Sequence, residues 1–303
     1  MRAPLDIAQP PASATPAGPT AHASALDWLL LLGPGLIWGA SFLFIAEGLE
    51  SVAPNGLTFT RILVGFFVLG LVPSARRPIA REDRGKVALL GLLWLALPLS
   101  MFPYAEQRVS SALTGMLNGA NPLLVAIVAA AFSRRLPGRE VLVGLAVGLV
   151  GTVLVAWPSL RLGGSSLDGV LLILVGVSCY GFALNLARPL QQRSGALPVI
   201  WRAQAWGLLL TAPLGVPELL RAHWRPGPLL AVLALGALGT GVAYVLLAVA
   251  AGRVGATRAA ATTFLIPGVA LVRGEHVAGL SIVGGVVCVA GAWLMRRAQL
   301  AAH

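Results

Sequence analysis

Charged residues are scarce in this sequence, since Asp, Glu, Lys and Arg together make up only 11% of its 303 positions. Soluble domains carry about 25% charged residues. Hydrophobic residues make up 57% of the chain, and the mean hydropathy is +0.84. A chain of this composition could not face water over a large surface. It is therefore no ordinary soluble domain, and we expect an integral membrane protein.

Residues that build catalytic and metal sites are also few. The two cysteines, Cys179 and Cys288, each lie in an apolar run, and they are too few for a disulfide framework or a cysteine metal site. The four histidines fall in predicted tails and loops. No acidic residue falls at the middle of a predicted helix, and Glu47 and Glu106 come nearest. The sequence therefore predicts no enzyme, no metal and no cofactor, and it argues against proton coupling through a buried carboxylate.

Apolar runs of spanning length follow an Ala- and Pro-rich tail. Residues 1–26 lack an apolar core and the pattern of a signal peptide, which predicts a disordered cytoplasmic tail. A spanning helix needs about 20 mostly apolar residues. The fold class predicted is an all-α membrane protein of about ten transmembrane helices. The predicted helices cover residues 28–46, 55–72, 87–105, 109–132, 141–158, 168–187, 198–216, 228–251, 255–272 and 278–295.

Basic residues outnumber acidic ones 22 to 11, but they lie in short clusters between apolar runs. This placement indicates loops beside anionic lipid and not a nucleic-acid interface. If the N-terminus is cytoplasmic, fifteen of the basic residues fall inside and five outside. The bias predicts a multi-pass protein of the plasma (inner) membrane with both termini in the cytoplasm. The five outer residues are Arg108, Arg161, Arg221, Arg225 and Arg273.

The two halves of the chain resemble each other. Arg108-Val109 and Pro122 recur as Arg253-Val254 and Pro267, at one offset of 145 residues. Each half would hold five helices, and an odd number inserts the second half upside down. Inverted repeats of this kind are typical of transporters; the alternative is chance similarity between low-complexity apolar segments. The predicted units are the repeats 27–158 and 159–297, followed by a C-terminal tail at 298–303.

The second repeat is shorter than the first. Gly144 and Gly151 match Gly284 and Gly291 at an offset of only 140, so either the second half lost about five residues between Pro267 and Gly284 or the first half gained them. The predicted helix at 255–272 would then reach about 27 Å, which barely crosses a bilayer.

A set of short motifs in fixed order carries a family resemblance. They are Trp38-Gly39-Ala40-Ser41, Arg61, Tyr104-Ala105-Glu106, Asn121-Pro122, Gly239-Thr240-Gly241, Arg253-Val254, Pro267 and Gly274-Glu275. Across nearly all of 28–297 the chain resembles an EamA-type member of the drug/metabolite transporter superfamily. The resemblance implies ten helices in two inverted repeats, with alternating access to a central cavity. It also implies a metabolite or drug as cargo, often an exported amino acid or nucleobase-like compound.

The leading hypothesis is therefore a membrane exporter of a small molecule, working by facilitated movement or exchange. Only six residues, Gly268 to Arg273, stand where the family usually has about eleven before its Gly-Glu pair. This departure raises an alternative: a transport-impaired relative with a scaffold or regulatory role. The glycine-rich ends of the halves could equally form a homodimer contact.

Polar and aromatic residues inside helices are the cavity candidates. Each has a structural alternative: Arg61 could bind an anion, pair with Glu47 or Glu106, or reach the membrane surface. Trp38 could simply pack, the tyrosines could lie at the interface, and the amides and threonines could join helices or satisfy backbone freed by proline. Pro122 and Pro267 are predicted kinks. The predicted substrate-binding residues are Trp38, Arg61, Tyr104, Asn118, Asn121, Tyr180, Asn185, Gln204, Tyr244 and Thr263.

Overall fold

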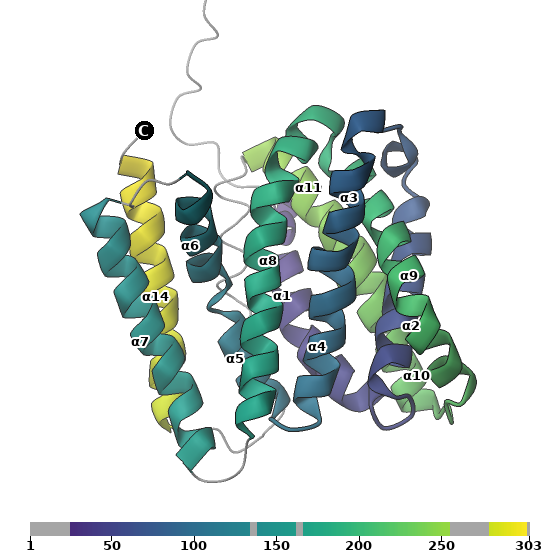
Figure 1. Cartoon of the computed structure of the whole chain (residues 1–303), viewed down its shortest axis with the longest axis horizontal. Helices are drawn as coiled ribbons and strands as arrows, with labels where there is room; N and C mark the ends of the chain where they lie inside the picture. The colour runs from purple at the N-terminus through teal and green to yellow at the C-terminus, as the bar shows by residue number, and fades with distance from the viewer. Residues whose placement is uncertain (1–24, 134–137, 162–165, 255–278, 302–303) are drawn as a thin grey trace, which may run out of the picture.

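The computed structural model describes residues 25–133, 138–161, 166–254 and 279–301, and over these ranges the chain is helical without strands (Figure 1). The predicted all-α class is confirmed at this level. The main helices are α1 (Ala25–Gly48), α2 (Pro54–Gly70), α3 (Arg84–Leu90), α4 (Leu97–Glu106), α5 (Ser111–Asn118), α6 (Asn121–Ser133), α7 (Arg139–Arg161), α8 (Leu167–Ser194), α9 (Ala196–Leu220), α10 (Pro226–Ala234), α11 (Ala243–Val254) and α14 (Gly279–Ala301).

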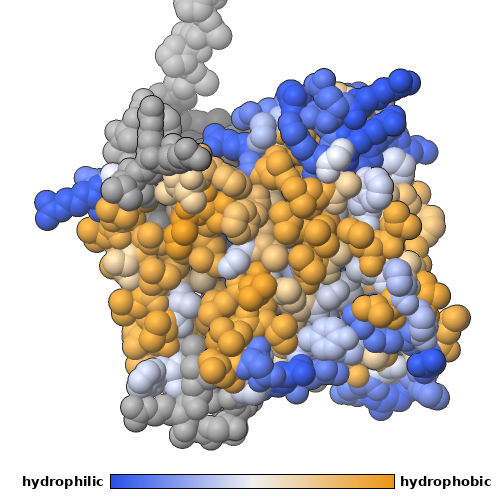
Figure 2. Space-filling view, viewed as in Figure 1, coloured by the Kyte–Doolittle hydropathy of each residue, from blue (hydrophilic) through white to orange (hydrophobic). Residues whose placement is uncertain are grey.

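Nine of the ten predicted helices coincide with helical stretches, and the tenth, at 255–272, lies outside the described residues. Four stretches are long and apolar enough to cross a membrane, at 81–106, 111–132, 167–194 and 226–250. The surface carries a broad apolar band between hydrophilic ends (Figure 2). Exposed side chains such as Phe67 and Leu214 belong to membrane-facing positions, because water would not stabilise so many of them.

Two helical stretches contain a π-helical turn. The turn η3 (Gly91–Ala96) joins α3 to α4, and η4 (Leu235–Val242) joins α10 to α11. A π turn widens the helix and leaves backbone carbonyls with poorer internal partners, and such turns are frequent at functional sites. Neither turn is evident from the local sequence pattern.

The predicted helix at 109–132 is divided into α5 and α6. Gly119 and Ala120 form the turn, with backbone bonds to Met116 and Leu117. Pro122 is the second residue of α6 and has no N–H to continue the ladder of α5. The division places the side chains of Asn118 and Asn121 at two facing helix ends.

Glycines let two helices at one end of the bundle, α7 and α14, lie side by side (Figure 1). A Cβ added at Gly151 would come within 2.3 Å of the Cys288 backbone nitrogen, and one at Gly284 within 2.5 Å of the Val155 nitrogen. The backbones therefore touch, which is how small residues drive helix association in membranes.

The segment between α2 and α3 is basic at its surface but holds one buried acid. Arg76, Arg77 and Arg84 are exposed. Asp83 is only 1% exposed, and its carboxylate accepts a hydrogen bond of 2.8 Å from Arg193 at the end of α8. Gly195 lies between the end of α8 and the start of α9. Its φ of 85° is a backbone conformation that glycine adopts without strain.

Candidate functional site

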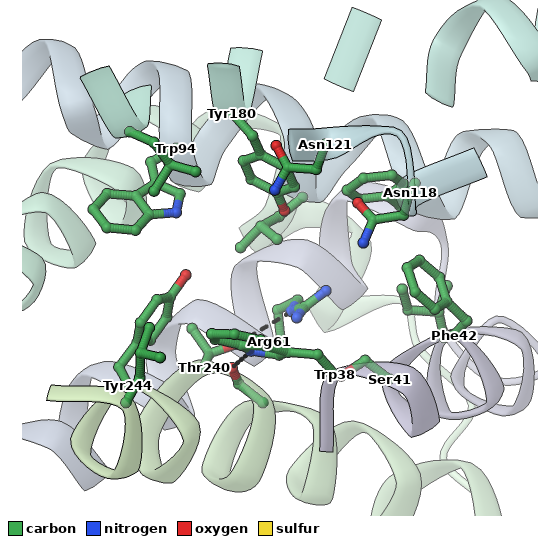
Figure 3. Close-up of a pocket in the computed structure, with 16 residues that line it drawn as sticks. Trp38, Ser41, Phe42, Arg61, Trp94, Asn118, Asn121, Tyr180, Thr240 and Tyr244 are labelled. Atoms are coloured by element: carbon green, nitrogen blue, oxygen red, sulfur yellow. Dashed lines mark hydrogen bonds between the residues drawn. The ribbon is translucent and has the colours of Figure 1, made fainter. Parts of the chain in front are cut away.

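A cavity of about 220 Å³ lies inside the bundle (Figure 3). Its lining comes from helices of both halves of the sequence, chiefly α1, α2 and α4 from the first and α8, η4 and α11 from the second. The lining residues are Trp38, Ser41, Phe42, Ile45, Arg61, Trp94, Leu99, Phe102, Asn118, Asn121, Tyr180, Leu184, Gly239, Thr240, Tyr244 and Leu247.

Six aromatic rings form most of the wall. Tyr244 packs edge-on against both Trp38 and Trp94, with ring centroids 5.6 and 5.7 Å apart. Phe102 packs in the same way against Phe42 at 5.8 Å. Edge-to-face pairs at this distance are favourable beyond the area they bury, so these contacts help to hold the wall in shape.

Trp38 is fixed by a hydrogen bond as well as by packing. Its indole N–H donates to the backbone oxygen of Gly239 at 2.9 Å. Gly239 lies within the π turn η4, where a backbone carbonyl forms a weaker hydrogen bond within its own helix. The bond therefore ties α1 to the widened part of the partner helix and orients the indole at the cavity wall.

Arg61 lies on α2 and is only 5% exposed. Its Nε–H donates to the hydroxyl oxygen of Thr240 at 3.3 Å, and the rest of the guanidinium faces the cavity (Figure 3). Thr240 is held in turn, because the side-chain amide of Gln204 donates to its backbone oxygen at 2.6 Å. This burial does not agree with the alternative in which Arg61 reaches the membrane surface.

Asn118 and Asn121 lie on the opposite side of the cavity from Arg61 (Figure 3). Their amide nitrogens are drawn on the side toward the guanidinium. Their Oδ1 atoms are buried, and within the described ranges neither oxygen has a hydrogen-bond partner. The break between α5 and α6 thus presents two amides to the cavity that the protein itself leaves partly unused.

The sequence profile of the EamA-like transporter family matches residues 27–157 and again residues 167–297. The chain belongs to the EamA-like transporter family. The two matches cover both halves of the sequence, so the family resemblance is confirmed, and with it a membrane protein of transporter ancestry.

Curated relatives of this EamA-like protein are also named as transporters. It is 28% identical over 269 residues to "Uncharacterized transporter YdfC" of Bacillus subtilis, covering 84% of this chain and 86% of that protein. It is 27% identical over 289 residues to a "Probable terminal-alkyne amino-acid exporter" of Streptantibioticus cattleyicolor, covering 90% and 94%. A crystal structure at 21% identity superposes with a TM-score of 0.58 over 88% of this chain and 95% of that chain, which supports the fold.

Six of the ten predicted binding residues of this EamA-like chain line the cavity described above. They are Trp38, Arg61, Asn118, Asn121, Tyr180 and Tyr244. Thr263, like the predicted kink at Pro267, lies outside the described residues.

Three predicted residues use their polar atoms elsewhere. Asn185 donates to the backbone oxygens of Val125 and Gly181, at 3.0 and 2.9 Å, and so joins α8 to α6. The amide of Gln204 donates to the Thr240 backbone oxygen in η4. Tyr104 takes part in a separate hydrogen-bond cluster at the start of α2. For Asn185 and Gln204 these bonds agree with the alternative of joining helices, whereas the alternative stated for Tyr104 was a position at the membrane interface.

Several lining residues were not predicted. Ser41 and Phe42 follow Trp38 by three and four positions, so helical spacing places them on one face, and that spacing was the signal available. Trp94 and Phe102 look like ordinary core aromatics in the sequence. Only the packing of their helices turns them toward the cavity.

A polar cluster closes the start of α2. Asn55 donates from its amide to the Tyr104 hydroxyl and to Glu218, each at 2.7 Å. The second carboxylate oxygen of Glu218 accepts from the backbone N–H of Gly56 at 2.8 Å. A carboxylate at a helix N-terminus satisfies a free N–H and interacts favourably with the helix dipole.

Glu218→Gln should therefore destabilise the protein by about 1–2 kcal/mol, because it removes the charge that caps α2 while leaving the shape. Thermal unfolding in detergent measures the change. Glu140→Gln, at the exposed start of α7, is the matched control and should have a smaller effect. Equal effects of the two substitutions would contradict the role given to Glu218.

Proposed function

We propose that this protein moves a small molecule across the plasma membrane by alternating access through the aromatic cavity. The observation that carries the proposal is the cavity's position between helices from both halves of a transporter-family chain. A site at the junction of two repeats becomes accessible from either side when one half rocks against the other.

Contacts between the halves support two inverted five-helix repeats, residues 27–158 and 159–297. The π turn η3 of the first half packs on α9 of the second, and η4 of the second packs on α2 of the first. Gly91 in η3 and Gly236 in η4 lie 145 positions apart, the offset of the sequence repeat. A Cβ at Gly91 would meet α9, and one at Gly236 would meet α2, each at under 3.0 Å. In this reciprocal packing the π turn of each half contacts a helix of the other half, as a two-fold axis in the membrane plane would produce.

The topology we propose has ten spanning helices, with residues 255–272 as the ninth, and short cytoplasmic tails. The C-terminal end of α14 lies at the same end of the bundle as the start of α3 (Figure 1). The exposed arginines before α3 support our proposal that this end faces the cytoplasm together with the C-terminus. Export is the direction we favour, supported by the exporter named among the relatives.

The cavity suits a cargo smaller than most drugs. Its volume of about 220 Å³ is below the about 300–1,000 Å³ of drug-sized sites. Among the lining residues that the structure describes, none is acidic. Facilitated movement or exchange therefore suits the site better than coupling to a proton held on a buried carboxylate.

Ligand-dependent thermal stability of the purified protein tests the site. The panel holds amino acids, nucleobases, sugars, organic cations and drugs; a ligand at about 100 times its Kd should stabilise the fold by about 2.7 kcal/mol. We expect Trp38→Ala to weaken the binding of any such ligand at least about tenfold, or about 1.4 kcal/mol, because the mutation opens the wall. Trp206→Ala, on the exposed face of α9, is the control. A ligand bound equally by both variants would place the site elsewhere.

The second candidate is the transport-impaired relative, and it rests on the short Gly268–Arg273 segment, which lies outside the described residues. Inserting five apolar residues after Pro267 separates the two functions. Transport by the repaired chain alone would favour the impaired relative. Equal transport by both chains would favour the carrier.

A further inference from the structure

Arg61 is a buried cation, and no carboxylate among the described residues forms a contact ion pair with it. Within the described ranges its side-chain hydrogen bond runs from the Nε–H to the Thr240 hydroxyl, at 3.3 Å. A guanidinium has five N–H donors. An ionised side chain within a membrane protein is costly unless something compensates it, and such residues mark functional sites.

The surroundings of Arg61 offer only distant or neutral partners. The charge of Glu106 acts on Arg61 through space. Tyr180 and Tyr244 contribute hydroxyl groups to the lining, and Asn118 and Asn121 contribute amides. Ser41 and Thr240 add two further hydroxyl groups, and the other lining side chains are aromatic or aliphatic. The cavity is thus apolar with one positive charge, a field that attracts an anion and disfavours a cation.

We propose that Arg61 is the residue that recognises the cargo, and that the cargo is a small molecule with one carboxylate on an apolar body. The inference rests on the proposed function, since it assumes that the cavity holds the cargo. The carboxylate would receive paired hydrogen bonds from the free nitrogens of the guanidinium, and the apolar body would lie against Trp38 and Tyr244. The amides of Asn118 and Asn121 would contact a second polar group.

A carboxylate fits better than a phosphate because of charge. One arginine compensates one negative charge, and no second basic residue lines the cavity among the residues described. A doubly charged phosphate would leave a buried charge without a partner, which is strongly unfavourable in an apolar site. A free inorganic anion also has no apolar group that could pack against the aromatic wall.

The test uses pairs of ligands of nearly the same shape, in which a neutral carboxamide replaces the charged carboxylate. The full-length protein is purified in detergent and its thermal stability measured with 4-methylpentanoate, 3-phenylpropanoate, leucine and phenylalanine, each against its carboxamide. We expect at least one acid to stabilise the wild-type protein and to bind at least about tenfold more tightly than its amide. Arg61→Gln should abolish that preference, and Arg61→Lys should keep part of it.

Arg202→Gln is the matched control for the loss of a charge. The guanidinium of Arg202 bonds to the backbone oxygens of Ala75 and Pro198 and lies over Trp201, away from the cavity. This variant should keep the preference for acids. If Arg61→Gln proves unstable, Thr240→Val removes the hydroxyl that accepts from Arg61 and that also donates to the Leu235 backbone oxygen, and it should weaken acid binding more than amide binding.

Three results would overturn the inference: acids and amides binding alike, an acid preference that survives Arg61→Gln, or no acid stabilising a folded protein. If neutral or cationic ligands bind the wild-type protein and their binding is lost in Trp38→Ala, anion recognition by Arg61 is contradicted while the proposed carrier function stands. The carrier function itself fails only if the cavity is not reached from both sides of the membrane, which thiol labelling measures without any cargo.

Discussion

Gly284→Ala should destabilise the protein by about 3 kcal/mol, the upper end of what overpacking of a core costs. The new Cβ would lie 2.5 Å from the Val155 backbone nitrogen and 2.8 Å from the Gly151 oxygen. Backbone atoms cannot rotate away as a side chain does, so α7 and α14 must separate. Unfolding in detergent, followed by helical circular dichroism, measures the change.

Gly285→Ala is the neighbouring control, because nothing lies within 4 Å of a Cβ added there. It should leave stability unchanged or raise it by up to about 1 kcal/mol, since alanine favours a helix over glycine. Similar stabilities for the Gly284 and Gly285 variants would show that the two backbones are not in contact. The account of this helix pair would then be wrong.

Arg193→Gln should destabilise the protein by about 3 kcal/mol, and Asp83→Asn by only about 1 kcal/mol. The asymmetry follows from burial: Asp83 is 1% exposed, whereas the side chain of Arg193 is 49% exposed. Removing the arginine leaves a buried carboxylate without its partner, which is strongly destabilising. Removing the carboxylate leaves a half-exposed cation that water still solvates and that Glu82, at 3.6 Å, still pairs with.

Chemical unfolding of the two single variants and the double variant measures this coupling as a double-mutant cycle. The double variant should be closer in stability to Asp83→Asn than to Arg193→Gln, because no unpaired buried charge remains. Arg188→Gln, on an exposed position of the same helix, is the control. A larger loss for Asp83→Asn than for Arg193→Gln would contradict the burial argument.

The sequence predicted much of the bundle because spanning helices follow from long apolar runs. It also marked Trp38 and Arg61, since an indole or a guanidinium well inside such a run is unusual. The turn between Asn118 and Asn121 had its signal in Pro122, although the predicted helix ran through it. These features depend on local composition, which a single sequence displays.

Other features depend on partners distant in the chain. The π turns η3 and η4 form where glycines meet α9 and α2, and no local pattern reveals that contact. Asp83 looked like one more charge in a basic loop, but it is buried and pairs with the half-exposed Arg193, 110 positions away. Trp94 is a cavity residue only because its helix presents it to Tyr244, so the sequence could not separate it from the core.

Thiol labelling from the two sides of the membrane tests the central claim most directly. Cys179 and Cys288 are replaced by alanine, and Leu184→Cys places a thiol in the cavity wall. Ile62→Cys, fully buried outside the cavity, is the control. Alternating access predicts that an impermeant maleimide labels Leu184→Cys in both right-side-out and inside-out vesicles, and that a bound ligand slows labelling. Labelling from one side only, with or without ligand, would contradict a carrier that exposes this cavity to each face in turn.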